Sequence, residues 1–174
     1  MRRSHLLLCA DIELARFKVL RTRGQLPLMS GCVDDADSRG ATYSLDDAFR
    51  LRLLLDVIGQ DDDLPAVPPA KAAGLIDNAL TWIVGNGLPH PLEAREGPDL
   101  WVGVAVIESG QSDARYRFSN WFAGSLTELP VFIERAESEA FGDAAVRIVI
   151  VNASRAARLV RKRALRLGLP EAEE

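Results

Sequence analysis

The chain has 174 residues, of which 48% are hydrophobic, and a formal net charge of −4 at pH 7. This size and composition support one large domain or two small ones with a substantial hydrophobic core. The apolar runs are far shorter than the ~18 residues of a membrane span, and the N-terminal stretch turns acidic too soon for a signal peptide. We therefore expect a cytoplasmic protein without membrane contact, in which Cys9 and Cys32 are structural thiols.

The first helices predicted along the chain are a short one and a basic one. "SHLLLC" predicts a short helix that begins at a Ser4 cap, and "ADIE" predicts the tight turn after it. "IELARFKVLRTRGQLPL" predicts a helix over residues 12–22, which Gly24 and Pro27 terminate.

A polar segment and a second, well-specified helix follow. Residues 28–42 are rich in Gly, Ser and Asp and predict a loop or a small hairpin. Ser44 is an N-cap with the acidic Asp47 at the third helical position, and apolar residues then recur at helical spacing over 45–58, up to Gly59.

This N-terminal order, and two motifs in it, resemble the MerR-like winged helix-turn-helix DNA-binding family. "RTRGQLP" is similar to the end of the family's recognition helix, and "TYSLDDAFRLRLLLDVI" to the helix after its wing. The resemblance covers about residues 3–58 and implies that the basic helix enters the major groove while the wing lies on the phosphates. The DNA-facing residues that it implies are Arg16, Lys18, Arg21 and Arg23 on the helix, Arg39 on the wing and Tyr43 at the base of the wing.

The second half of the chain predicts a separate α+β unit. "GQDDDLPAVPP" is a boundary, and the helix after it, over 70–84, has a wide apolar stripe that packs on the first domain or joins two copies. Two strands with a hairpin turn, a helix opened by a Ser125–Glu128 capping box near Pro130, a third strand and a last helix complete the order. The expected ranges are 100–108 and 114–121 for the strands of the hairpin, about 125–138 for the helix, 144–151 for the third strand, and a helix from an Asn152 or Ser154 cap to Leu167.

The expected fold class is therefore α+β, with an N-terminal MerR-like winged helix-turn-helix and a small strand-strand-helix-strand-helix domain. We expect the winged helix over residues 1–60, a linker and connecting helix over 61–95, and the small domain over 96–174.

Catalytic chemistry has little support in the sequence. His5 and His90 are the only histidines, the two cysteines lack metal-binding spacing, and a weak calcium-loop pattern at Asp35 fails at the position of Arg39. Neither a phosphate-binding glycine motif nor a nucleophile elbow is present. We expect a protein that is not an enzyme and holds no metal or cofactor.

The charge is distributed unevenly and directs the functional hypothesis. Residues 1–30 carry a net +4 and residues 155–166 a net +6, so the rest of the chain carries −14. Two basic islands on an acidic body are typical of local contact with nucleic acid, and solvated helix faces are the other interpretation. In the second island Arg155, Arg158, Lys162 and Arg166 share one helix face, which could meet DNA phosphate, an acidic partner or the protein's own acidic segments.

The preferred hypothesis is a transcriptional regulator that binds double-stranded DNA as a homodimer. Its DNA contacts would include Arg155, Arg158 and Lys162, and its dimer interface would use the helix over 70–84 or the strands. The alternative is a non-catalytic protein-interaction module, of phage or mobile-element type, that keeps the winged helix as a scaffold.

Overall fold

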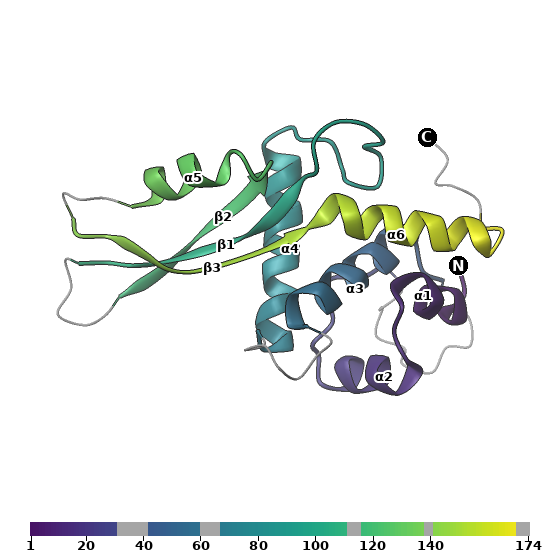
Figure 1. Ribbon diagram of the computed structural model, residues 1–174. Coiled ribbons are helices and arrows are strands. Elements are labelled where there is room, and N and C mark those ends of the chain that lie inside the picture. Colours follow the sequence, from purple (N-terminus) through teal and green to yellow (C-terminus); the bar gives the residue numbers. More distant parts are fainter. Residues whose placement is uncertain (31–41, 60–66, 111–115, 138–140, 170–174) are drawn as a thin grey trace.

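A helical head and a projecting sheet make up the computed structural model of the protein, which describes residues 1–30, 42–59, 67–110, 116–137 and 141–169 (Figure 1). Within these ranges the chain forms six helices and one antiparallel three-stranded sheet, so the predicted α+β class is confirmed. The wing and Arg39 fall on residues 31–41, outside the described residues, and the winged helix stays a prediction. The elements are α1 (Arg3–Ala10), α2 (Leu14–Thr22), α3 (Leu45–Ile58), α4 (Pro69–Gly85), β1 (Trp101–Glu108), β2 (Arg117–Gly124), α5 (Leu129–Ala136), β3 (Ala144–Asn152) and α6 (Ala153–Arg166).

The first two helices are short and are joined by three residues. Helix α1 has Arg2 as its N-cap residue, so the predicted Ser4 cap is wrong and Ser4 lies inside the first turn. Helix α2 ends as predicted, because Gly24 takes a φ of +62° and lets the N–H groups of Gly24 and Gln25 bond back to the last turn. The buried side chains of Phe17 and Leu20 anchor α2 to the head.

The start of α3 is fixed by a buried carboxylate. Asp47 and Ser44 form the predicted capping box, in which Ser44 Oγ accepts from Asp47 N at 3.0 Å and Asp47 Oδ2 accepts from Ser44 N at 2.7 Å. The same carboxylate also accepts from Ser30 N at 2.7 Å and from Ser30 Oγ at 2.6 Å. Asp47 therefore holds the segment that leaves α2 against the segment that enters α3.

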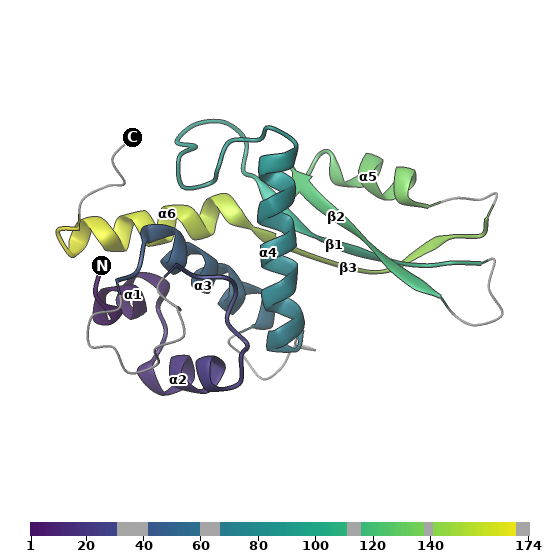
Figure 2. The same cartoon turned by 180° about the vertical axis from the view of Figure 1, so that it is seen from behind.

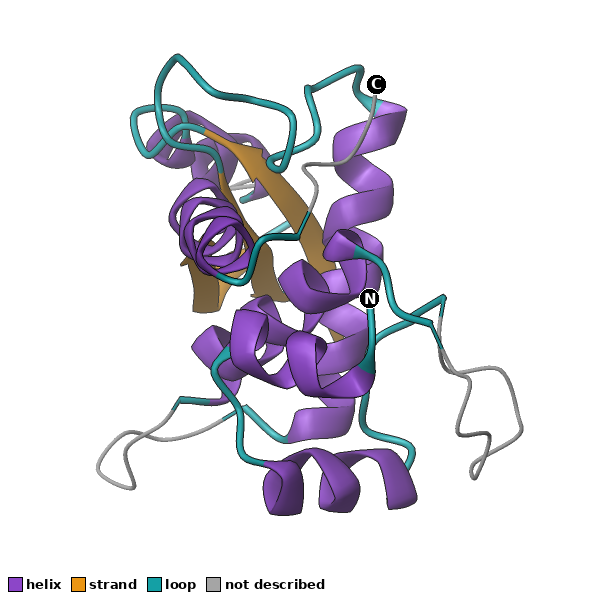
Figure 3. Cartoon of the chain, turned by 90° about the vertical axis from the view of Figure 1, so that its right-hand side faces the viewer, coloured by secondary structure: helices purple, strands orange, loops and turns teal. Residues whose placement is uncertain are grey.

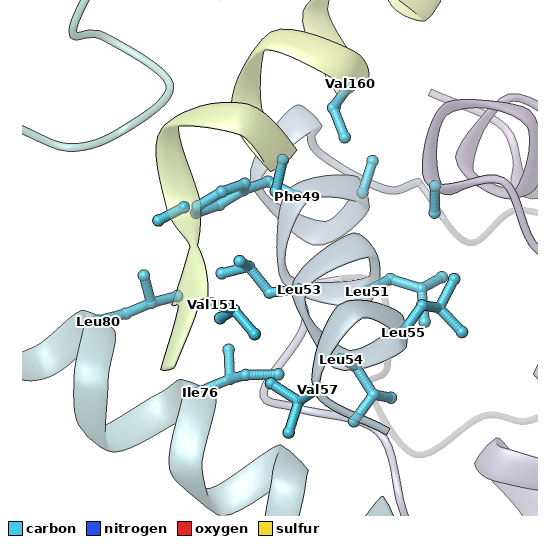
Figure 4. Packing of buried hydrophobic residues seen from close by; sticks show 14 of the residues in the cluster. Phe49, Leu51, Leu53, Leu54, Leu55, Val57, Ile76, Leu80, Val151 and Val160 are labelled. Atoms are coloured by element: carbon cyan, nitrogen blue, oxygen red, sulfur yellow. The ribbon is translucent and has the colours of Figure 1, made fainter. Parts of the chain in front are cut away.

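Helix α3 lies at the centre of the head and packs against α1, α4 and α6 (Figures 1 and 2). Its apolar side chains point to several sides, as expected for a helix that is surrounded by others (Figure 4). Ile76 and Leu80 of α4 and Val160 of α6 belong to the same hydrophobic core. Helix α4 thus packs on α3 and on strands β1 and β2 of its own chain, and its contact with α3 is the first of the two roles predicted for its apolar stripe.

The sheet has the order β2-β1-β3 and carries α5 along one face, where the rings of Phe122 and Phe132 are 5.2 Å apart. The predicted order of strands and helices is confirmed, but two starts are shifted. Strand β2 begins at Arg117, three residues late, because its register places Gly124 opposite Trp101. Helix α5 begins only at Leu129, with Pro130 in its first turn, while the Glu128 carboxylate accepts from Ser125 N at 2.7 Å.

Strands β1 and β3 approach each other most closely at Gly103. A Cβ atom added there would lie 2.0 Å from the carbonyl oxygen of Val149 and 2.8 Å from Cα of Ile150. We expect Gly103→Ala to lower the free energy of unfolding by about 1–3 kcal/mol or more, because the strands would have to separate. Urea unfolding followed by circular dichroism measures this loss.

The matched control is Gly74→Ala in the middle of α4, where an added Cβ meets no atom within 4 Å. This variant should be more stable than the wild type by about 0.5–1 kcal/mol, because alanine favours a helix over glycine. Equal unfolding midpoints for the two variants would contradict the close approach of β1 and β3.

Candidate functional site

Most of the first predicted basic island, residues 1–30, lies on α2, while Arg2 and Arg3 stand at the start of α1. Arg16, Lys18 and Arg23 are exposed and Arg21 is half-buried, and α2 itself contains no acidic residue. Arg16 also donates from Nη2 to the carbonyl oxygen of Gly59 at 3.1 Å, which holds its side chain near the end of α3. We call these four residues the α2 basic surface.

Tyr43 lies apart from this surface. Its side chain is only 5% exposed and belongs to the hydrophobic core, and its backbone N–H donates to the carbonyl oxygen of Met1 at 2.8 Å. Its burial gives Tyr43 a packing role, and we leave it out of the functional proposal below.

The second island forms the exposed face of α6, as predicted. Arg155, Arg158, Lys162 and Arg166 are all exposed, whereas Ala156, Val160 and Ala164 are buried against the head. Helix α6 lies above α3 and α2 lies below it in all three orientations (Figures 1, 2 and 3). The exposed face of α6 is turned away from α3, so the two islands form separate surfaces that face different directions.

Part of the charge on α6 serves to fasten the fold. Arg163 Nη2 lies 2.7 Å from Asp11 Oδ2 in the turn between α1 and α2, and Arg163 Nη1 donates to the carbonyl oxygen of Cys9 at 3.3 Å. The buried Arg52 of α3 pairs with Asp56 and lies 3.7 Å from Asp11. The protein's own acidic groups therefore account for some of the basic residues of the second island.

An open, strongly basic hollow lies on the outer surface of α6 beside Arg95. Its volume is about 490 Å³, and we call it the α6 groove. Sequence reasoning assigned Arg158, Lys162 and Arg166 to one face but missed Arg95 and Arg161, which the fold adds to it. The lining residues are Arg95, Arg158, Arg161, Lys162, Leu165 and Arg166.

Two of these arginines hold the neighbouring segment over residues 92–99 in place. Arg158 donates from Nη1 and Nη2 to the Asp99 carboxylate at 2.5 and 3.0 Å, and Asn152 Nδ2 donates to the same carboxylate at 2.7 Å. The bonds from Arg158 and then from Asn152 lower the pKa of Asp99 to about 2. Arg161 donates from Nη1 to the carbonyl oxygens of Leu92 and Ala94 at 2.7 and 3.4 Å.

The groups considered for catalysis have structural surroundings. His90 Nε2 lies 3.3 Å from Asp46 Oδ1, and its ring packs edge-on against Phe49. Burial raises the pKa of the Cys9 thiol. Among the described residues, no group of three or more His, Cys, Asp or Glu side chains could hold a metal ion, and no helix is long and apolar enough to cross a membrane.

Comparison with known proteins adds no assignment. No protein-family model matches the chain, and no curated protein matches its sequence significantly. The resemblance to the MerR-like family therefore remains an expectation, and the functional argument depends on the two basic surfaces.

The ion pair between Asp99 and Arg158 predicts an acid-shifted titration. We expect the Asp99 carboxyl to titrate near pH 2, and Arg158→Gln to raise the pKa of Asp99 toward its ordinary 3.8. Because the pKa is lowered in the folded protein, the pair stabilises the fold above about pH 4 and this stabilisation is lost as the pH falls toward 2. Titration of the side-chain carboxyl signals by NMR measures the shift.

Arg155→Gln is the matched control, because it removes an exposed arginine of the same helix whose side chain does not bond to Asp99. It should leave the pKa of Asp99 close to the wild-type value. An Asp99 carboxyl that titrates near pH 4 in the wild type would refute the ion pair.

Proposed function

We propose that the protein is a DNA-binding transcriptional regulator whose helix α2 enters the major groove. The observation that carries this proposal is the α2 basic surface, four cations on or at the end of a nine-residue helix without an acidic side chain. Helices α1 and α2 are joined by a three-residue turn, the spacing of a helix-turn-helix. Nine residues rise about 13 Å, and a major groove about 12 Å wide admits such a helix.

The outward face of α2 has the composition of a base-reading surface. At 3.6 residues per turn, Lys18 and Val19 point away from the buried Phe17 and Leu20. Val19 is 47% exposed, which core packing does not explain, and an apolar side chain in the major groove can contact a thymine methyl group. In this arrangement Lys18 meets a base edge or a phosphate, while Arg16 and Arg21 lie on the two flanks of the helix and meet the two phosphate backbones.

One short recognition helix covers only a few base pairs, so a regulator of this kind binds two half-sites as a two-fold dimer. The α4 stripe is buried within the chain, which leaves the projecting sheet with α5 as the surface for self-association. Strand β3 is at the edge of the sheet, and Val146 and Ile148 on it are 47% and 40% exposed. The same exposed apolar strand also favours the second candidate function, a non-catalytic protein-interaction module.

Loss of Lys18 tests the role of α2. Binding sites are first selected from a random pool of duplexes, and binding by Lys18→Ala is then measured by fluorescence anisotropy at several salt concentrations. A phosphate contact would lower the slope of log affinity against log salt by about 0.9 on every duplex. A base contact would cost about 1–3 kcal/mol on the selected site and relax sequence preference there.

Lys71→Ala is the control, because it removes the same charge from an exposed position on α4. It should change neither the affinity nor the slope by more than experimental error. Identical losses in the two variants would show that only the overall charge matters, and an absence of duplex binding by the wild type would refute the proposal.

The dimer is tested through the edge of the sheet. We expect light scattering at tens of micromolar to give the mass of two chains, and Ile148→Glu to give the mass of one, because a charge would be buried at the interface. Val84→Glu on α4, at a position that is also exposed, is the control and should stay dimeric. A monomeric wild type, with and without DNA, would exclude the two-fold arrangement.

A further inference from the structure

The α6 groove concentrates positive charge in a concave part of the surface. Five of its six lining residues are cationic; Arg158 bonds to the Asp99 carboxylate, and Arg95 also has a partner of its own. Lys162 and Arg166 have no hydrogen bond or ion pair with any residue that the structure describes. Like charges at helical spacing repel one another, so this arrangement gains stability when an anion lies between them.

The groove is held in its shape by bonds that do not involve a ligand. Arg161 ties the carbonyl oxygens of Leu92 and Ala94 to α6, and Arg158 ties Asp99 to it. Leu100 N adds a third bond, to Ser154 Oγ at 2.9 Å. A preformed site costs little ordering when a ligand binds, and each arginine fork keeps further N–H groups for it.

The size and the side chains of the groove indicate the chemistry of its ligand. The hollow of about 490 Å³ is wide open to solvent and lined mainly by cations, so it suits a small, highly charged anion that stays partly hydrated. Arginine forks recognise phosphate in two-point contacts, and Arg158 and Arg166 stand about 12 Å apart along the axis of α6 at ~1.5 Å per residue. A single phosphate cannot reach cations spread over that length, whereas a chain of linked phosphates can.

We propose that the α6 groove binds a compact oligophosphate, at a site separate from the α2 basic surface. Leu165, which is 56% exposed in the wall of the groove, leaves room for an apolar group attached to the phosphate chain. The site goes beyond the DNA-binding role proposed for α2, and it gives the protein a ligand through which DNA binding could respond to a small molecule.

The experiment is calorimetric titration of the full chain with inorganic triphosphate. The test variant is Lys162→Gln with Arg166→Gln, which removes the two cations that bond to no described residue and so leaves the walls intact. We expect saturable binding by the wild type and about tenfold or weaker binding by the variant. Circular dichroism verifies its folding, and Arg95→Gln, in the irregular segment, repeats the test if the double variant does not fold.

Two controls separate this site from diffuse attraction and from the DNA-binding proposal. Arg155→Gln removes a charge from α6 outside the groove, and Lys18→Ala removes one from α2; both should bind triphosphate as the wild type does. Lys18→Ala can therefore lose DNA binding while the groove still binds its ligand. Loss of triphosphate binding in Arg155→Gln equal to that of the double variant would overturn the proposal.

The class of ligand is tested by competition. Citrate, a compact anion of comparable charge with carboxylates in place of phosphates, should bind more weakly than triphosphate, and a DNA duplex should not displace triphosphate. Equal binding of citrate, displacement by the duplex, or an absence of saturable binding would each overturn the assignment of the groove to an oligophosphate.

Discussion

The whole fold depends on α3, which has apolar side chains on nearly every side and is stable only when other elements cover them. Ten of its fourteen residues are buried, among them the charged Asp47 and Arg52, so no single neighbour can cover it. The partners come from the whole length of the chain: α1 from the start, α4 from the middle and α6 from near the end. The head is therefore one packing unit around α3, and both basic surfaces lie on helices whose inner faces are fixed by this core.

The basic residues divide into those that fasten the protein and those that face outward. Arg158, Arg161 and Arg163 each bond to a carboxylate or a carbonyl oxygen of another segment, and Arg52 pairs with Asp56 of its own helix and lies 3.7 Å from Asp11. Lys18 and Lys162 are exposed and can bind a partner. Because arginine offers several N–H groups in a planar fork, one side chain can serve both purposes, and the α6 groove combines them in Arg158 and Arg161. Net charge alone would not separate these roles.

Helices α3, α4 and α6 and strands β1 and β3 could be predicted from the sequence, because caps and apolar periodicity are local signals. The Ser44–Asp47 box lies where the pattern places it, and Asn152 is one of the two caps that the pattern allowed for α6. Features whose position depends on residues far away in the sequence could be located less accurately. Strand β2 takes its register from β1, and Arg95 reaches the groove only because residues 92–99 fold back on α6. The position of Arg161, three residues after Arg158, could have indicated that it lies near the same face of α6. Its bonds to Leu92 and Ala94, however, depend on tertiary structure. The predicted boundaries near residues 60 and 95 divide the chain into separate units. One hydrophobic core nevertheless contains residues from both halves of the chain.

The position of α6 has a consequence for synthesis of the chain on the ribosome. Helix α6 covers α1 and α3 and is joined to the turn between α1 and α2 by Arg163, yet it is the last helix of the described chain to be made. Until it emerges, the apolar faces of α1 and α3 that it covers remain open to solvent and to chaperones. Contacts between residues 9–11 and residue 163 span most of the sequence, and such distant contacts slow folding. The N-terminal helices, although translated first, can complete their packing only after the sheet has been synthesised.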